Sequence, residues 1–155
     1  MRAYYQIIEA LNNSLSNNNI TQSVTIGDIT EVDLNRRTIF PLAHIVPTAG
    51  AIEQSFITID FSITFADVVD ISDENAKNNP EPFLGHNNLQ DVHNTQLAAA
   101  NLLVQSMLRG DLWDNDFKVT TSPTVEPFQD RFENTLAGWV LNFQVEIRNT
   151  DTSIC

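Results

Sequence analysis

The sequence predicts an α+β fold in which two helices pack on one face of a mainly antiparallel sheet. Residues 56–70 alternate large apolar side chains with Thr, Asp and Ser, which is the period-two pattern of a strand with one buried face. Residues 139–148 repeat this alternation. Because each strand has one polar face, we expect an antiparallel sheet that is covered on one side only. Residues 3–16 and 89–108 carry apolar residues at helical spacing and supply the covering layer.

The apolar positions of the two long strands should point into the core. A slip of one residue would turn all of them outward, so their burial tests the predicted register. They are Ile57, Ile59, Phe61, Ile63, Phe65, Trp139, Leu141, Phe143, Val145 and Ile147.

The first helix should end at the asparagines 17–19, since Asn tolerates the left-handed conformation common at helix ends. Residues 20–26 then begin a β region that stops at the turn pair Gly27-Asp28, and residues 29–34 could continue it. Residues 38–46 read as a strand interrupted by Pro41, which predicts an edge strand or a bulge at that position. Residues 47–50, Pro-Thr-Ala-Gly, are expected to turn the chain into the long strand.

Residues 71–88 form a polar segment that is long for a loop in a compact domain, and such loops are usually functional or mobile. Asn87 or Asn88 can cap the second helix, and Gly110 can stop it. Residues 117–121 and 124–128 read as short strands on either side of Pro123, and Gly138 leads into the last strand. The apolar stripe of the second helix is Leu89, Val92, Ala99, Ala100, Leu103 and Met107, widened by Leu102 and Leu108.

Composition favours one domain over residues 1–155, because 155 residues with 42% apolar content can bury a sizeable core. Twenty acidic residues against eight basic ones give a net charge of -12. The basic stripe that displaces counterions from phosphates is missing, so tight nucleic-acid wrapping is not expected. An acidic channel past which DNA slides remains compatible with this charge. Cys155 is the only cysteine, which excludes an intramolecular disulfide.

Residues 3–11 are amphipathic, so we expect no signal peptide. No run approaches the ~20 apolar residues of a membrane span, and the expectation is a soluble protein made in a cytoplasm.

The residues that could carry chemistry do not form a recognised motif. His44, His86 and His93 lack the spacing of a zinc site. The acidic residues 67, 70, 73 and 74 lack the alternate spacing and the glycine of a calcium loop. There is no G-x-S-x-G nucleophile motif and no phosphate-binding glycine loop. We therefore expect no enzyme activity, no metal and no cofactor.

The order of elements resembles the tail terminator and tail completion proteins of tailed bacteriophages, which are neck proteins of the head–tail junction. The resemblance rests on an N-terminal helix and on the strand-turn-strand VTIGDITEVDL. It continues with F-P-L-x-x-I-x-P at residues 40–47, the long alternating strand with its acidic loop, a second helix, and Ala-Gly-Trp at residues 137–139 before the last strand.

The resemblance implies a structural subunit of the virion, made in the host cytoplasm, that assembles into a six- or twelvefold homo-oligomeric ring. Portal or adaptor proteins would lie above this ring and tail proteins below it. The genomic DNA would pass through the lumen without specific binding, and no membrane would be involved.

Residues 71–88 are expected to form an arm that reaches an adjacent subunit or ring. Phe83 and Leu84 stand between Pro82 and Gly85 in a polar stretch, and leaving both exposed would be unfavourable. The arm's acidic residues would face basic residues of a neighbour. The candidate contact residues are Arg36, Arg37, Asp73, Glu74, Phe83 and Leu84.

Two other interpretations stay open. A soluble ligand-binding or enzymatic α+β domain would have a pocket between the sheet and the helices, with a few converging polar groups. Another component of a virion or secretion tube would differ mainly in its partners.

Overall fold

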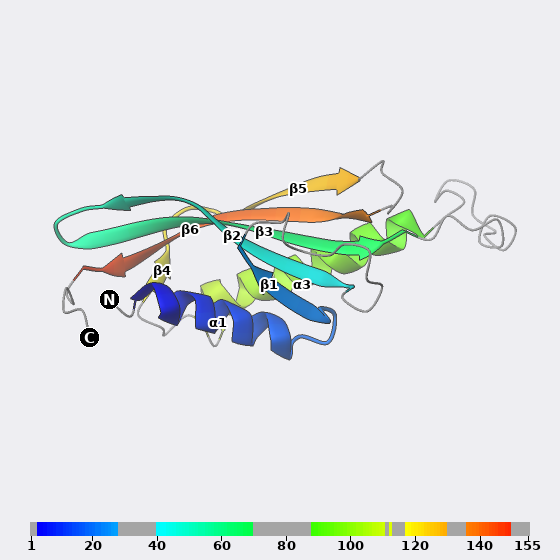
Figure 1. Cartoon of the computed structure of the whole chain (residues 1–155), viewed down its shortest axis with the longest axis horizontal. Helices are drawn as coiled ribbons and strands as arrows, with labels where there is room; N and C mark the ends of the chain where they lie inside the picture. The colour runs from blue at the N-terminus through cyan, green and yellow to red at the C-terminus, as the bar shows by residue number, and fades with distance from the viewer. Residues whose placement is uncertain are drawn as a thin grey trace, which may run out of the picture.

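A computed structural model describes residues 3–27, 40–69, 88–110, 112, 117–129 and 136–149. Within these residues it shows two helices and a six-stranded, mostly antiparallel sheet, which confirms the predicted α+β fold class. The helices α1 (Ala3–Asn17) and α3 (Leu89–Arg109) lie on the same side of the sheet (Figure 1). The long strands run along the longest axis of the molecule (Figure 1).

The sheet has the strand order β1-β2-β3-β6-β4. The strand β5 pairs with the same edge of β6 as β4 does, but with an earlier part of it. All pairs are antiparallel except that of β1 with β2, which is parallel. The strands are β1 (Ser23–Ile26), β2 (Leu42–Ile52), β3 (Phe56–Val68), β4 (Phe117–Val119), β5 (Thr124–Gln129) and β6 (Leu136–Arg148).

The predicted register of the two long strands is confirmed, since β3 and β6 pair side by side and bury their odd-numbered residues. Phe61 stacks on Phe143 with ring centroids 5.7 Å apart. Ile59 and Trp139 are only half-buried. Ile59 lies opposite Gly50, which offers no side chain to cover it. The buried positions are Ile57, Phe61, Ile63, Phe65, Leu141, Phe143, Val145 and Ile147.

The predicted turn at residues 47–50 is wrong, because β2 continues through these residues to Ile52. The chain absorbs Thr48 as a β-bulge between Pro47 and Ala49, so pairing with β3 resumes beyond it. The hairpin turn comes later, where the N–H of Glu53 donates to the carbonyl of Phe56 at 2.8 Å.

Pro41 is neither in an edge strand nor at a bulge, contrary to the sequence prediction. It lies just before β2, where its carbonyl accepts the N–H groups of Gln22 and Ser23 at 2.9 and 3.2 Å. Its missing N–H therefore costs no ladder hydrogen bond. The short strands around Pro123 are confirmed as β4 and β5, and β6 begins at Leu136, before Gly138.

The main core lies between the sheet and the two helices, with Ile7, Leu11 and Leu15 supplied by α1. The α3 stripe buries Leu103 and Met107 as predicted, but Leu102 is 48% exposed and does not join the core. Asn18 ends α1 in a different way from the one predicted. Its side-chain oxygen accepts the N–H groups of residues 20 and 21, and no described residue other than glycine has a positive φ.

The other face of the sheet is not uniformly polar. At one end it carries a second apolar cluster of Phe40, Leu42, Ala66 and Leu136, against which Phe128 packs. Along the middle, a polar network replaces apolar contact. Thr120 donates its hydroxyl to the Gln144 amide oxygen at 2.7 Å, and the Gln144 amide nitrogen donates to Asp60 at 2.7 Å. The expectation of a sheet covered on one side only therefore holds for the middle of the sheet and fails at that end.

Candidate functional site

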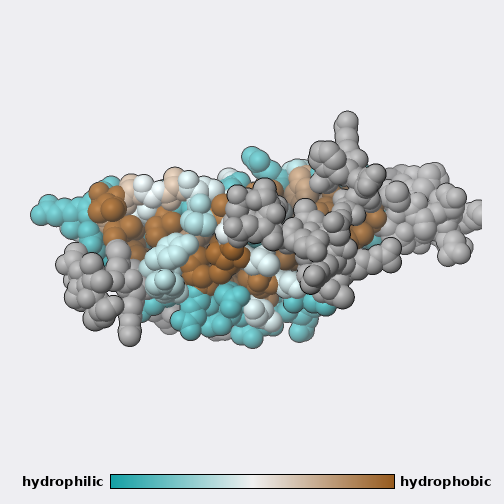
Figure 2. Space-filling model, viewed as in Figure 1, coloured by the Kyte–Doolittle hydropathy of each residue, from teal (hydrophilic) through white to brown (hydrophobic). Residues whose placement is uncertain are grey.

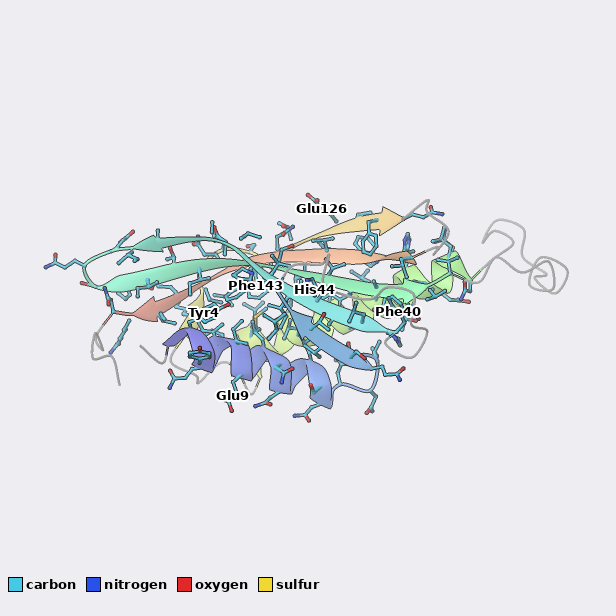
Figure 3. All side chains as sticks on the ribbon, in the orientation of Figure 1. Tyr4, Glu9, Phe40, His44, Glu126 and Phe143 are labelled. Atoms are coloured by element: carbon cyan, nitrogen blue, oxygen red, sulfur yellow. The ribbon has the colours of Figure 1, made fainter. Side chains whose placement is uncertain are left out.

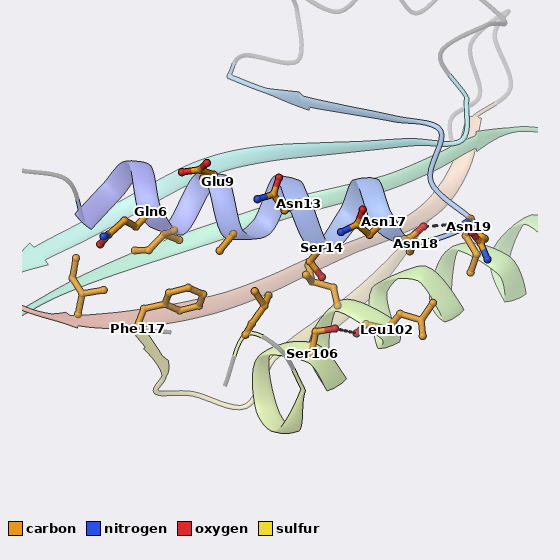
Figure 4. A pocket seen from close by; sticks show the side chains of 16 residues that line it. Gln6, Glu9, Asn13, Ser14, Asn17, Asn18, Asn19, Leu102, Ser106 and Phe117 are labelled. Atoms are coloured by element: carbon orange, nitrogen blue, oxygen red, sulfur yellow. Dashed lines mark hydrogen bonds between the residues drawn. The ribbon is translucent and has the colours of Figure 1, made fainter. Parts of the chain in front are cut away.

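A groove of about 710 Å³ runs between α1 and the C-terminal half of α3 (Figure 4). Asn13, Asn17 and other amide side chains form its rim, whereas Leu103 and Phe117 contribute an apolar floor. The size falls within the range of small-molecule or peptide sites. A pocket between the sheet and the helices was expected only under the alternative ligand-binding interpretation, and the sequence did not predict its residues, because they come from segments that are far apart in the chain.

The groove offers binding groups and little chemistry. Among the described residues that line it, only Glu9 is ionisable. The hydroxyl of Ser106 donates to the carbonyl of Leu102 at 3.0 Å, so it serves its own helix (Figure 4). The described lining thus contains no pair of a nucleophile and a base, and it can bind a ligand through amides and apolar contact.

His44 is a structural histidine on the face of β2 that points away from the helices. Its side chain is 1% exposed. Its Nε2 lies 2.7 Å from the carbonyl of Gly27, which can only accept, so this nitrogen carries the proton. Its Nδ1 lies 2.6 Å from the Thr25 hydroxyl oxygen. In this tautomer Nδ1 carries no proton, so it accepts a hydrogen bond from that hydroxyl. These two hydrogen bonds connect β2 to Thr25 of β1 and to Gly27, which follows β1.

His93 and Trp139 join α3 to the sheet. The indole N–H of Trp139 donates to the carbonyl of His93 at 2.8 Å, and the two rings meet edge to face with centroids 5.9 Å apart. The Nε2 of His93 lies 3.3 Å from the carbonyl of Phe128 on β5. His86 lies outside the described residues. In the part of the chain that the structure describes, no three metal-binding side chains gather at one point.

Two polar groups sit in unfavourable surroundings. Partial burial raises the pKa of the Asp67 carboxyl, and the hydrogen bond that it accepts from the N–H of Val68 lowers it to a smaller extent. Gln96 on α3 is completely buried, and neither its amide nitrogen nor its amide oxygen has a hydrogen-bond partner. Neither residue lines the groove.

The predicted contact residues all fall outside the described part of the chain. This applies to the acidic residues and the apolar pair of the 71–88 segment and to both arginines, so the arm hypothesis stays a prediction. The residues concerned are Arg36, Arg37, Asp73, Glu74, Phe83 and Leu84.

The exposed tip of the β2–β3 hairpin is a second candidate surface. Residues 46–52 of β2 carry no charge, and β1 covers the edge of β2 only as far as Ile45. Ile52 is 81% exposed and Phe56 is 38% exposed. Figure 2 shows hydrophobic residues near this tip, at the left, and again between the sheet and α1. An uncharged strand edge with no described strand beside it is a ready template for another strand.

Neither a scan of protein-family models nor a search of curated proteins finds a match for this chain. Among the described helices, none has the length and apolarity needed to cross a membrane.

Proposed function

We propose that this chain is a ring-forming structural subunit of the head–tail junction of a tailed bacteriophage, either a tail terminator or a neck-ring protein. The observation that carries the proposal is the β2–β3 hairpin, which offers an uncharged strand edge and exposed apolar residues at one end of the sheet. Such a surface favours association with another protein chain. The order of elements along the sequence adds the resemblance to phage neck proteins.

The charge of the chain suits a ring that surrounds DNA. A net charge of -12 for each copy repels phosphates. Acidic residues occur in both layers, and Glu9 on α1 and Glu126 on β5 project from opposite sides of the molecule (Figure 3). The genome would therefore move through the lumen without being held by it. Portal or adaptor proteins and tail proteins would be the partners, and the virion would be the location.

The test is deletion of the gene from the phage that encodes this chain, followed by electron microscopy of the lysate. The proposal expects DNA-filled heads and separate tails that do not join, with infectivity restored by the chain supplied in trans. Normal virions from the deletion strain would contradict it.

The groove favours a second candidate function, a ligand-binding domain. Its apolar floor and amide rim would suit a peptide or a small amphipathic molecule. Screening by thermal shift would reveal the ligand, and Asn13→Trp, a change at an exposed residue of the rim, would weaken its binding without disturbing the core. A screen that finds no stabilising compound would leave the structural role preferred.

A further inference from the structure

One row of apolar residues crosses the sheet from one edge to the other. Its inner members are completely buried, but its two ends are not, since Ile26 on β1 is 44% exposed and Val125 on β5 is 38% exposed. The strands β1 and β5 lie at opposite edges of the sheet (Figure 1). Each edge therefore leaves one apolar side chain of this row in water. The row consists of Ile26, Ile45, Ile63, Leu141 and Val125.

The outer edge of β1 offers backbone hydrogen-bonding groups at Val24 and Ile26. The N–H groups of Ser23 and Gly27 donate to the carbonyls of residues 41 and 45 at 3.2 and 3.1 Å, so these odd-numbered residues point inward to β2. Neighbouring residues of a paired strand direct their backbone groups to opposite sides. Val24 and Ile26 therefore direct their N–H and C=O groups outward, where no described strand lies beside them.

The outer edge of β5 offers its groups at Val125 and Pro127. The N–H of Thr120 donates to the carbonyl of Gln144 at 3.1 Å, so the even-numbered residues of β6 point toward β4 and β5. Their partners on β5 are also even-numbered and point inward, which leaves residues 125 and 127 outward. Pro127 offers only its carbonyl, because proline has no N–H.

The two edges have matching directions and matching rows. The strand β1 is parallel to β2, and three antiparallel steps lead from β2 through β3 and β6 to β5, so β1 and β5 run in opposite directions. A second copy placed beside the first, without a shift along the strands, therefore brings β1 antiparallel to β5. In this placement outward residues of one edge face outward residues of the other.

We propose that β1 pairs antiparallel with β5 of a second copy, head to tail, with Ile26 opposite Val125 and Val24 opposite Pro127. The two exposed ends of the apolar row then cover each other. Three of the four possible backbone hydrogen bonds form, because only the carbonyl of Val24 meets no donor. The contact rests on the proposed ring only for its closure, since a head-to-tail interface closes when the rotation between copies allows it.

The described strands and helices leave room for this placement. On the hairpin side of Ile26, the width of one strand stays open between β2 of one copy and β4 of the next, so no described strand meets another. Five strands about 4.8 Å apart give each copy a width of about 24 Å. That width holds two helices whose axes lie about 10 Å apart.

Charge favours the pairing of β5 with β1 over the pairing of β5 with itself. The strand β1 carries no charged residue, and Glu126 of β5 lies opposite Thr25 in the proposed register. A twofold pairing of β5 about Glu126 would set two carboxylates opposite each other, which is unfavourable. It would also set each Val125 opposite Pro127 and so lose two of the four backbone hydrogen bonds.

The contact leaves the β2–β3 hairpin free for a different partner. Copies that are related head to tail and without a shift direct their hairpins to the same end of the assembly. The exposed Ile52 and Phe56 would therefore lie together on one rim. Such a rim suits a contact with the protein above or below the ring in the proposed head–tail junction.

A pair of opposite charges tests the contact. Ile26→Lys and Val125→Glu should each weaken self-association by at least roughly tenfold, because each places a charge against an apolar side chain in every contact. An equimolar mixture should associate again, since Lys at position 26 then meets Glu at position 125, and the remaining contacts are those of the parent chain. Sedimentation velocity of the full chain measures this, and circular dichroism checks the fold. The reversed pair, Ile26→Glu and Val125→Lys, repeats the test if a variant does not fold.

Matched controls separate the contact from a general effect of charge. Ile52→Lys adds the same charge to an 81% exposed residue at the hairpin, and Val68→Glu adds its charge to a 37% exposed residue of the central strand β3. Both should associate like the parent chain. Ile26→Lys also makes the net charge less negative, so relief of overall repulsion would strengthen association instead of weakening it.

Three results would overturn the proposal. One is a mixture that associates no better than either variant alone. Another is Val125→Glu that associates like the parent chain while Ile26→Lys does not, which would indicate a twofold contact of β1 with itself. The third is a parent chain that stays monomeric at millimolar concentration.

The outcome also separates this contact from the proposed function. Open fibres that require Ile26 and Val125 would uphold the edge pairing and contradict the closed neck ring. Closed rings that form equally well in Ile26→Lys and Val125→Glu would overturn the edge pairing and leave the neck ring standing.

Discussion

Gly138 of β6 lies so close to Phe65 of β3 that a Cβ atom at position 138 would sit 1.8 Å from the Phe65 carbonyl oxygen. No side chain can occupy that space without moving one of the two central strands. Gly138 pairs with Ala66 of β3 on one side and with Phe128 of β5 on the other. Both of these residues belong to the second apolar cluster or pack against it.

Gly138→Ala should lower the free energy of unfolding by about 1–3 kcal/mol or more, because the methyl group forces β3 and β6 apart. Urea denaturation of the monomer measures the change. Gly50→Ala is the control, since its Cβ would meet the Thr58 carbonyl at 3.3 Å and a smaller loss is expected. Equal losses in the two variants would show that the close approach at Gly138 is not the cause.

Gln96→Met should raise the free energy of unfolding by about 1–3 kcal/mol. The substitution replaces two buried amide atoms that have no partner with an apolar side chain of similar length. Gln90→Met, on the exposed side of the same helix, should change stability by less than about 0.5 kcal/mol. A large loss of stability in Gln96→Met would mean that the buried amide makes favourable contacts that the described side chains do not supply.

Asp67→Asn should raise the melting temperature at neutral pH. Burial raises the pKa of Asp67 in the folded state, so the folded protein favours the protonated form. The stability that Asp67 contributes is fully present below its unfolded pKa, near 3.8, and is lost as pH rises through the folded pKa.

The two proteins should therefore melt alike below that pH and diverge above it. Thermal melts across the acid range measure the difference. A difference between them that does not vary with pH would rule out ionisation of Asp67 as its source.

Most of the fold could be predicted from the sequence because strict alternation and helical spacing depend only on neighbouring residues. The Pro-Thr-Ala-Gly segment misled the prediction, since these residue types are typical of turns. The bulge at Thr48 that keeps them in β2 depends on pairing with β3. The uncovered edge of β2 beyond Ile45 was equally out of reach, because it requires the pairing of β1 with β2.

Self-association should strengthen as salt increases from about 20 to 300 mM. Each copy carries a net charge of -12, and salt screens this repulsion, whereas the proposed contact contains no ion pair that salt would weaken. Sedimentation velocity across a salt series gives the trend. Dissociation at high salt would instead mean that ion pairs dominate the contact.

The central claim is that this chain assembles into a closed ring, and native mass spectrometry of the purified protein tests it most directly. The account predicts one dominant species with a mass of six or twelve copies of the 17.4 kDa chain, which is lost in Ile26→Lys. A monomer, or a ladder of masses without an upper limit, would contradict it.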